Sequence, residues 1–384
     1  MKPHTSERKQ KKVRDSGIES LKIIAIFIIM ISHVTQTLTV VTPDFSYFEA
    51  VADVSIATTD VQTIVLLIFR HFGILGNNLF FICSAWFLLK STAYNKRKWF
   101  FMLAEIWSIS VIILSITYFL RHGNIPTDLL IKCVFPTLYA NNWYMTCYLI
   151  FYMIHPVLNG VIQRMSRVSL FRTTSVLVIM YLFLDFVNAD WFFPSQLTLW
   201  LTIYFAVAYM KNYLMHFADN IKANVILVIF NAVCFIGLII LTEIGGLHVA
   251  ALNDRMMRWA NYCNPFMFFI SVGMFNIARN IHFKNMLINY ISSLTLLIYI
   301  IHENLILRTY YRPAMWDYIY HTYGFDAVVG WIFIMVGIIF LFSVAASAIY
   351  TATIKKIVVP VSDSLYEYLR KYYLLLERKL LKNN

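Results

Sequence analysis

The sequence predicts an all-α polytopic membrane protein with about ten transmembrane helices and both termini in the cytoplasm. Of its 384 residues, 60% are hydrophobic and only 14% are charged, whereas a soluble domain is nearer a quarter charged. Apolar runs long enough to cross a bilayer recur along the chain. The alternation over about ten residues that marks a membrane β-barrel is absent. The backbone polar groups must therefore be satisfied within helices.

Ten spans follow from the apolar runs, and three regions follow from their boundaries. A basic cytoplasmic segment covers residues 1–20, a membrane domain covers 21–355, and a basic amphipathic cytoplasmic tail covers 356–384. The run that begins the first span is too long for the apolar part of a signal peptide and lacks a cleavage site. Pro194 breaks any continuous helix between the fifth and sixth spans. The spans are 21–40, 72–90, 99–120, 142–160, 173–190, 196–211, 223–243, 262–279, 286–307 and 327–354.

The basic residues set the orientation. With the N-terminus inside, 25 of the 32 Lys and Arg residues fall on the cytoplasmic side and seven fall outside. The net charge of +12 is explained by topology and by contact with anionic lipid, and it does not indicate a nucleic-acid partner. The five cysteines show no metal-ligand spacing, so we predict no redox role and no metal site. The amphipathic tail can lie on the inner leaflet or pack on a neighbouring loop.

The first span contains LKIIAIFIIMISHVTQT, with Lys22 near one end and His33 well inside. Eleven residues at about 100° each complete roughly three turns, so Lys22 and His33 share a face about 16 Å apart along the axis. An ionisable residue inside a span indicates a functional site, because a lone charge there costs several kcal/mol. Two simpler interpretations stay open: Lys22 can snorkel to the membrane surface, and His33 can form an interhelical hydrogen bond.

Polar residues of three other spans are predicted at the depth of His33. The ninth span carries a stripe at spacings of 3, 4 and 3 that ends in a histidine near the outer surface. Helix–helix hydrogen bonding accounts for the amides, and the interfacial aromatic belt accounts for the tryptophan and tyrosine, if each is taken alone. The residues are Asn77 and Asn78, Trp143 and Tyr144, and Ser292, Thr295, Tyr299, His302 and Glu303.

Cations gather where the second span is predicted to reach the cytoplasm. Lys90, Lys96, Arg97 and Lys98 can hold phosphate groups by charge and hydrogen bonds. Ordinary positive-inside charge explains them equally well. Glu105 lies about two turns into the third span, so we expect a basic partner for it at this end of the membrane.

Five stretches are similar, in order, to motifs of one family. The first has a Lys or Arg followed after ten residues by a His, and the last ends in a histidine of the family. Together they resemble the acyltransferase family 3 membrane acyltransferases over about residues 17–355, and within them the Gram-positive surface-polysaccharide O-acetyltransferases, including the intercellular-adhesin acetyltransferase type. The chain departs at Ala85, where glycine is usual, and at Lys22, where arginine is commoner. The stretches are KIIAIFIIMISH, NNLFFICSAWFLL, NNWYMTCYLIFYMIHPVLN, YCNPFMFFISVGMF and ISSLTLLIYIIH.

The resemblance implies transfer of an acyl group, expected to be acetyl, from cytoplasmic acyl-CoA to a hydroxyl of a cell-surface or secreted polysaccharide or its lipid-linked precursor. His33 would remove the hydroxyl proton or carry the acyl group itself. The implied setting is a bacterial plasma membrane, with glycan synthesis machinery as a further partner and no tightly bound cofactor. We assign His33, His302 and Asn78 to catalysis; Lys22, Lys96, Arg97 and Lys98 to acyl-CoA; and Asn77, Trp143, Tyr144 and Glu303 to the substrate.

Two other classes of protein compete with this prediction. A transporter or exporter of a glycan or its precursor would use the polar stripe as a translocation path, and membrane histidines also serve proton-coupled transport. A purely structural membrane subunit leaves the two histidines unexplained. Acylation by purified protein in liposomes, dependent on acyl-CoA, separates the enzyme from the transporter.

Overall fold

The computed structural model describes residues 15–41, 59–184, 186, 196–253, 263–324 and 326–382, and every regular element among them is helical. Two sequence predictions, the basic segment up to residue 14 and the break at Pro194, lie outside these residues. The long helices are α1 (Ser16–Val41), α3 (Val61–Leu88), α4 (Lys96–Leu120), α6 (Trp143–Arg164), α9 (Gln196–Tyr213), α11 (Ile221–Gly246), α14 (Pro265–Asn280), α18 (Val328–Ala352) and α19 (Lys355–Lys382). Shorter elements are α5 (Thr127–Val134), α7 (Arg167–Val178), η2 (Ile179–Leu184), α10 (Met215–Asp219), α12 (Ala250–Asn253), α15 (Met286–Ser293), α16 (Thr295–His302), η3 (Leu307–Tyr311) and α17 (Arg312–Tyr323).

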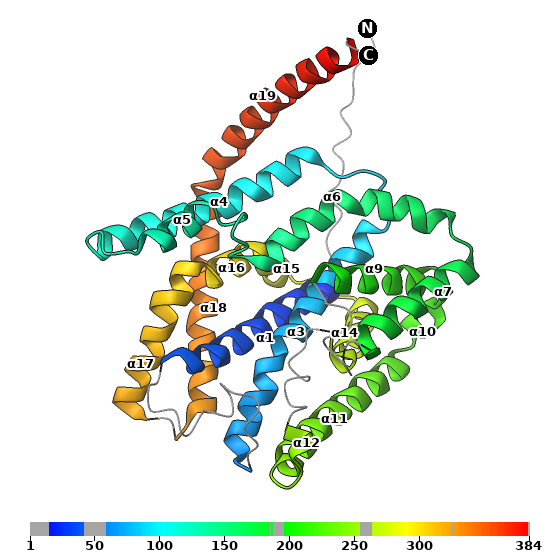
Figure 1. Cartoon of the computed structure of the whole chain (residues 1–384), viewed down its shortest axis with the longest axis vertical. Helices are drawn as coiled ribbons and strands as arrows, with labels where there is room; N and C mark the ends of the chain where they lie inside the picture. Colours follow the sequence, from blue (N-terminus) through cyan, green and yellow to red (C-terminus); the bar gives the residue numbers. More distant parts are fainter. Residues whose placement is uncertain are drawn as a thin grey trace.

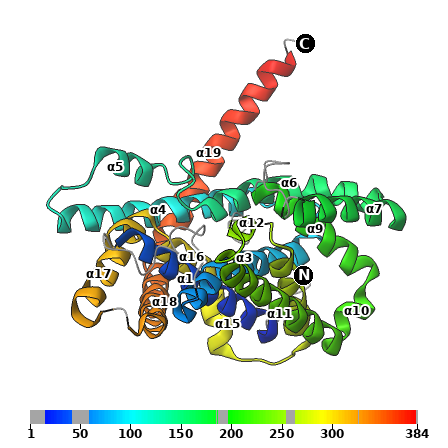
Figure 2. The ribbon, with the colours of Figure 1, turned by 60° about the horizontal axis from the view of Figure 1, so that its bottom comes forward.

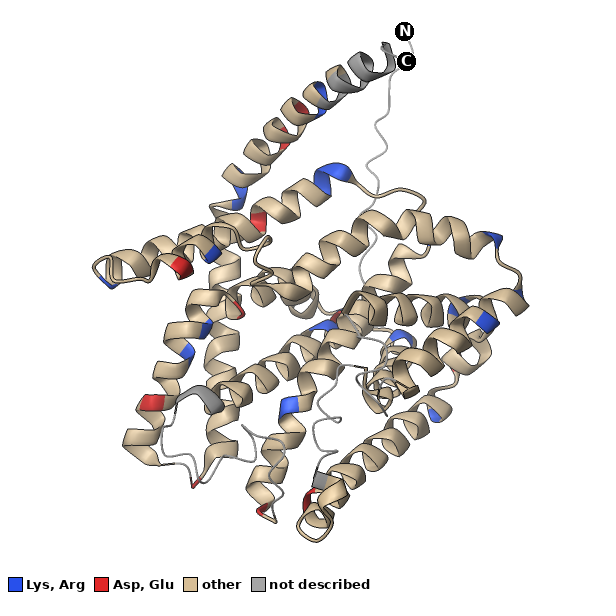
Figure 3. Cartoon of the chain, in the orientation of Figure 1, with Lys and Arg blue, Asp and Glu red and all other residues tan. Residues whose placement is uncertain are grey.

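Within the described chain, seven helices are long and apolar enough to cross a membrane. They are α1, α3, α4, α6, the segment Arg167–Leu184, α11 and α18. The predicted all-helical membrane protein is therefore confirmed, whereas the number of ten spans is not. The other three predicted spans fall on α9, on the 16-residue α14, and on 286–307, which the structure divides. Charged residues are sparse along these seven helices, whereas α19 carries several of both signs (Figure 3).

Helix α1 lies at the centre of the molecule and contacts α3, α14, α15, α16, α17 and α18 (Figure 1). Glycines on α3 allow its close approach to α1. A Cβ at Gly76 would lie 2.4 Å from Ile29 Cγ1 and 2.7 Å from the carbonyl oxygen of Ala25. A Cβ at Gly73 would lie 2.8 Å from Ser32 Oγ. These contacts also show that the two helices run antiparallel.

The predicted ninth span is broken twice, because short polar side chains offer the backbone alternative hydrogen bonds. Leu294 separates α15 from α16, and the hydroxyl of Thr295 donates to the carbonyl of Ser292. After α16, the side-chain oxygen of Asn304 accepts from the backbone N–H of Ile306 at 3.0 Å and starts a new turn. Irregular backbone of this kind is tolerated in a membrane protein where protein surrounds it, and Asn304 is buried.

Helix α19 projects from the body of the molecule in both ribbon views (Figures 1 and 2). Its first half packs along α4, where Arg97 pairs with Glu367 and the rings of Phe100 and Tyr366 lie 5.5 Å apart. The tail is thus helical and meets a helix rather than a loop. Nearby, Lys355 Nζ lies 3.0 Å from Glu105 Oε1, so the predicted basic partner of that glutamate is confirmed.

Candidate functional site

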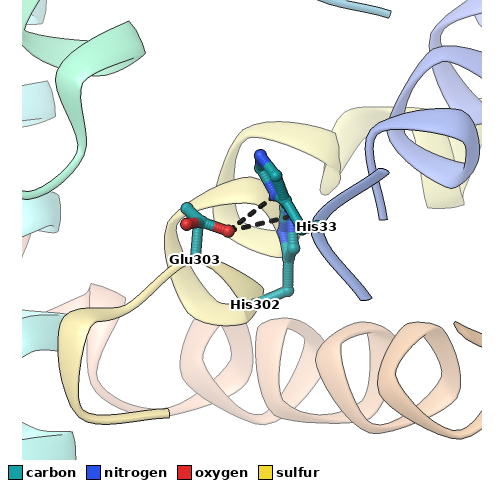
Figure 4. Close-up of side chains that lie close together, drawn as sticks. All are labelled: His33, His302 and Glu303. Carbon is teal, nitrogen blue, oxygen red and sulfur yellow. Dashed lines mark hydrogen bonds and ion pairs between the residues drawn. The ribbon is translucent and has the colours of Figure 1, made fainter. Parts of the chain in front are cut away.

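Two histidines and a glutamate meet between α1 and the end of α16 (Figure 4). His33 Nδ1 lies 2.6 Å from Glu303 Oε2 and 3.3 Å from His302 Nε2. The imidazole rings of His33 and His302 are stacked, with centroids 5.5 Å apart and planes inclined by 24°. His302 and Glu303 are buried, whereas the His33 side chain is 14% exposed. The structure therefore brings together three of the residues that the sequence placed at one depth.

The hydrogen bonds assign the proton positions of this trio. His302 Nδ1 lies 2.9 Å from the carbonyl oxygen of Ile298. A carbonyl only accepts, so His302 Nδ1 is the donor and Nε2 of neutral His302 carries a lone pair. His33 Nδ1 then faces two acceptors, and it must be the protonated nitrogen of that ring. His33 Nε2 is left with a lone pair, and among the described residues no side chain is bonded to it.

Two arginines hold Glu303. Arg308 Nη1 lies 3.1 Å from Oε1, and Arg312 Nη2 lies 3.3 Å from Oε2. The same Arg312 nitrogen donates to the carbonyl of His302 at 2.6 Å. A carboxylate this deeply buried needs charged partners and satisfied lone pairs. The two oxygens of Glu303 contact three side chains of the protein, those of His33, Arg308 and Arg312. This geometry favours a role in orienting His33, whereas the sequence analysis assigned Glu303 to the substrate.

Local sequence explains how the arginines reach the glutamate. Pro313 stands at the first turn of α17, where its missing N–H costs nothing and its fixed φ favours a helix start. Arg312 is therefore held at the beginning of α17, facing back to the end of α16. The indole N–H of Trp316 donates to the carbonyl of Val34 at 3.0 Å and ties the same helix to α1 beside His33.

Four buried polar atoms on α3, on α16 and next to the start of α6 have no hydrogen-bond partner among the described residues. They are Asn77 Oδ1, Asn78 Nδ2, Asn142 Oδ1 and the hydroxyl of Tyr299. Gly76 lies against Ala25 and Ile29, so the two α3 asparagines stand about one and a half to two helical turns from the level of His33. Such orphaned groups in a buried position require an explanation, and binding a polar ligand would satisfy them. No hydrogen bond joins them to the trio within the described chain.

A chain of aromatic rings leads from the trio to α6. Tyr299 lies edge-on to His302 with centroids 5.5 Å apart, Tyr144 lies 5.4 Å from Tyr299, and Trp143 lies 5.7 Å from Tyr144. Tyr144 is buried, while Trp143 is partly exposed. These two predicted substrate residues are thus connected to the histidines through Tyr299.

The cations predicted to hold acyl-CoA are separated by the structure. Lys22 Nζ lies 3.1 Å from Glu19 Oε2, which also accepts from Ser292, and the Lys22 side chain is 22% exposed. Lys98 lies over the ring of Tyr152 at 5.5 Å and interacts electrostatically with Lys22. Lys96 is exposed. Arg97 is paired with α19, so of these four cations only Lys22 and Lys98 are close enough to interact through their charges.

The trio also has the composition of a metal site, because its ligand atoms lie within 4.8 Å of one another. Two imidazoles and a carboxylate are a familiar zinc set. Ligands about 2.0–2.1 Å from a tetrahedral ion stand roughly 3.3 Å apart, whereas His33 Nδ1 and Glu303 Oε2 are 2.6 Å apart. With two guanidinium groups already on Glu303, the arrangement fits a hydrogen-bonded pair rather than a pair of metal ligands.

The sequence analysis missed Arg308 and Arg312, which it counted only as outside charges. One signal was available. The rule that predicted a basic partner for Glu105 applies equally to Glu303, and arginines follow that residue after five and nine positions.

Comparison with family models identifies the class of protein. An acyltransferase domain model matches residues 15–351. The chain therefore belongs to acyltransferase family 3 and is a membrane acyltransferase. Neither a search of curated proteins nor a search of solved structures found a match.

Proposed function

We propose that this enzyme transfers an acetyl group from cytoplasmic acetyl-CoA to a hydroxyl of a cell-surface or secreted polysaccharide or its lipid-linked precursor, in a bacterial plasma membrane. The observation that carries the proposal is the 2.6 Å contact between His33 Nδ1 and Glu303 Oε2, which leaves Nε2 of a partly exposed imidazole free to take a proton. A carboxylate that fixes the tautomer of a histidine and stabilises its protonated form is a recurring device of acyl transfer.

The proposed reaction follows from this tautomer. His33 Nε2 removes the proton of the acceptor hydroxyl while its oxygen attacks the thioester carbonyl. Glu303 stabilises the imidazolium that forms. As the C–S bond breaks, the proton passes from Nε2 to the sulfur of CoA, which leaves an O-ester and the free thiol. Asn78 Nδ2 and the Tyr299 hydroxyl, both buried donors without partners, are suited to stabilise the tetrahedral oxyanion.

The proposed donor site lies at the other end of α1. Lys22 and Lys98 supply positive charge for the phosphates of CoA, and eleven residues of helix separate Lys22 from His33 by about 16 Å. The acyl arm would extend from Lys22 toward His33. The partly exposed Trp143 would contact a sugar ring through its aromatic face, and the buried Tyr144 would support that indole.

The test is acyl transfer by the purified protein in liposomes. Radiolabelled acetyl-CoA is supplied with a surface polysaccharide, and acetyl ester formed on the glycan is measured. The proposal expects ester that depends on protein and donor. Glycan movement across the liposome membrane without esterification would support the transporter instead. In a deletion strain, the proposal expects O-acetyl signals to disappear from the NMR spectrum of the surface glycan.

A further inference from the structure

An apolar groove of about 620 Å³ reaches the candidate active site from one side. It lies between α4, α17 and α18, and its walls are almost entirely aliphatic and aromatic. His302 and Arg312 are among the few polar residues that line it. On α18 it extends from Ile338 to Tyr350, which corresponds to about 18 Å of helix. The groove is therefore long, apolar, and open to the residues that hold Glu303.

The groove faces the bilayer. Its α18 wall includes Phe342 and Ile349, whose side chains are more than half exposed in the isolated chain. A second hollow, between α17 and α18, shares Tyr311, Met315 and Ile338 with it. In a helix that crosses the membrane, such exposed apolar surface contacts hydrocarbon chains.

Two arginines outside the groove are close in sequence to its lining residues Thr117 and Tyr311: Arg121 is four residues after the first, and Arg308 is three before the second. The hydroxyls of Thr117 and Tyr311, both lining residues, lie 3.3 Å apart and join the end of α4 to η3. Arg121 lies over the ring of Tyr310 at 4.1 Å. Two residues before Tyr310 is Arg308, whose side chain is 40% exposed although it holds Glu303. An anionic group at this end would find guanidinium donors.

We propose, on the basis of the function proposed above, that the acceptor is a sugar carried on a lipid phosphate. Its hydrocarbon chain lies in the groove between α4, α17 and α18. Its phosphate lies at Arg121 and Arg308, and its sugar hydroxyl reaches His33 Nε2. The apolar walls can bind the hydrocarbon chain, and the two arginines can bind the phosphate. Because His302 lines the groove, a lipid bound there would carry its sugar to the candidate site. Acyl-CoA is matched instead by the lysines at the opposite end of α1.

Binding of a polyprenyl phosphate to the detergent-purified protein, measured by native mass spectrometry, tests the groove itself. Ala346 lines the groove, whereas its neighbour Ala345 is exposed and outside it. Ala346→Trp should weaken binding by at least about tenfold, as expected when a filled pocket loses its chain contacts. Ala345→Trp, the same change one position away, should bind as the wild type does. Equal binding by both variants would overturn the proposal.

A second pair of probes tests the phosphate position. Arg121→Gln should weaken polyprenyl phosphate by about tenfold, the scale of one charge-assisted contact, and leave the uncharged polyprenol unaffected. Competition by a matched excess of phosphatidylglycerol identifies the occupant. Displacement would show a general phospholipid site and overturn the proposal, and retention of the polyprenyl phosphate supports it.

Transfer assays separate this inference from the proposed function. Ala346→Trp should lower acetylation of a polyprenyl-phosphate sugar and leave acetylation of the free oligosaccharide unchanged. Equal loss with both acceptors would contradict the groove assignment. Absence of transfer to either acceptor by the wild-type protein would refute the proposed function, while the binding measurements still decide whether the groove holds the lipid.

Discussion

At the scale of single residues, the hydrogen bonds of the trio support the role proposed for His33 as the general base. His302 Nδ1 is fixed by a backbone carbonyl, and both remaining acceptors converge on His33 Nδ1. The lone pair that this leaves on His33 Nε2 is the one that the proposed mechanism uses to accept the proton. His302 is a positioning residue in this arrangement, because its ring stacks on His33 and its own protons are directed elsewhere.

His33→Ala should lower acetyl transfer by at least about a hundredfold, the lower end of the contribution of a general base. Expression should stay near normal, because His33 is partly exposed and its removal leaves no cation unpaired. The measurement is ester formed per mole of purified protein in liposomes. His216→Ala, at an exposed position in α10, is the matched control. Wild-type acetylation by His33→Ala would leave only the interhelical hydrogen bond as the role of His33.

Glu303→Gln should lower transfer by about a hundredfold or more, since the amide no longer stabilises the imidazolium. It should also cost about 3–5 kcal/mol of stability, because two arginines lose their buried partner. Turnover is therefore normalised to folded protein, and binding of CoA is measured as the readout that a merely misfolded variant would lose. Glu367→Gln, which removes the surface pair with Arg97, is the control. Full turnover by Glu303→Gln contradicts the assigned role.

Lys22→Gln should raise the KM for acetyl-CoA with little change in kcat, as expected when binding energy is lost equally from ground and transition states. The difference in KM between the wild type and the variant should become smaller at high salt, because salt screens the partly exposed charge of Lys22. Steady-state kinetics at two ionic strengths measures it. Lys222→Gln, on an exposed part of α11, is the control. Unchanged KM and unchanged CoA binding would place the donor elsewhere.

At the scale of elements, the packing of α1 against α3 sets the position of the histidine. Because a Cβ at Gly76 would lie 2.7 Å from a backbone oxygen of α1, neither helix can adjust by a side-chain rotation alone. The interface fixes how far Asn77 and Asn78 stand from the level of His33. Small residues that allow such close contact stabilise membrane helix pairs.

Gly76→Ala should destabilise the protein by about 1–3 kcal/mol, the usual range for overpacking, and lower transfer through displacement of α1. Thermal unfolding in detergent measures the first effect and the liposome assay the second. Gly337→Ala in α18, where an added Cβ meets nothing within 4 Å, should be neutral or slightly stabilising. Identical melting of the two variants would disprove the tight interface.

Sequence periodicity and hydropathy predicted the long helices well, because apolar runs and polar ends determine α1, α4, α6, α11 and α18. The predicted start of α3 at residue 72 is wrong, because the carboxylate of Asp60 accepts from the N–H of Thr63 and starts the helix at Val61. The break at Asn304 depends on a side-chain hydrogen bond that composition does not reveal. Counting basic residues by side likewise cannot distinguish buried Arg312 from an arginine among lipid head groups.

At the scale of the whole molecule, orientation is the remaining property that charge predicts. The excess of Lys and Arg on one set of loops predicts that both termini lie in the cytoplasm. A reporter fused after Asn384 should be active in the cytoplasm, and one inserted between Gly123 and Asn124 should be active outside. Each fusion shows that the protein is expressed when the reporter of the other fusion is inactive. Activity of the C-terminal reporter outside the cell would reverse the orientation and, with it, the assignment of the donor side.

The residues of the candidate site also come from distant parts of the chain. His33 and its partner His302 are 269 positions apart, whereas Glu303, Arg308 and Arg312 are close neighbours. At about 5–20 residues per second, a ribosome needs roughly 15–50 seconds between inserting the first helix and completing its partners. Throughout that interval the nascent chain holds an imidazole with no carboxylate to activate it. Acyl-CoA therefore meets a competent enzyme only after nearly all of the membrane domain has been translated.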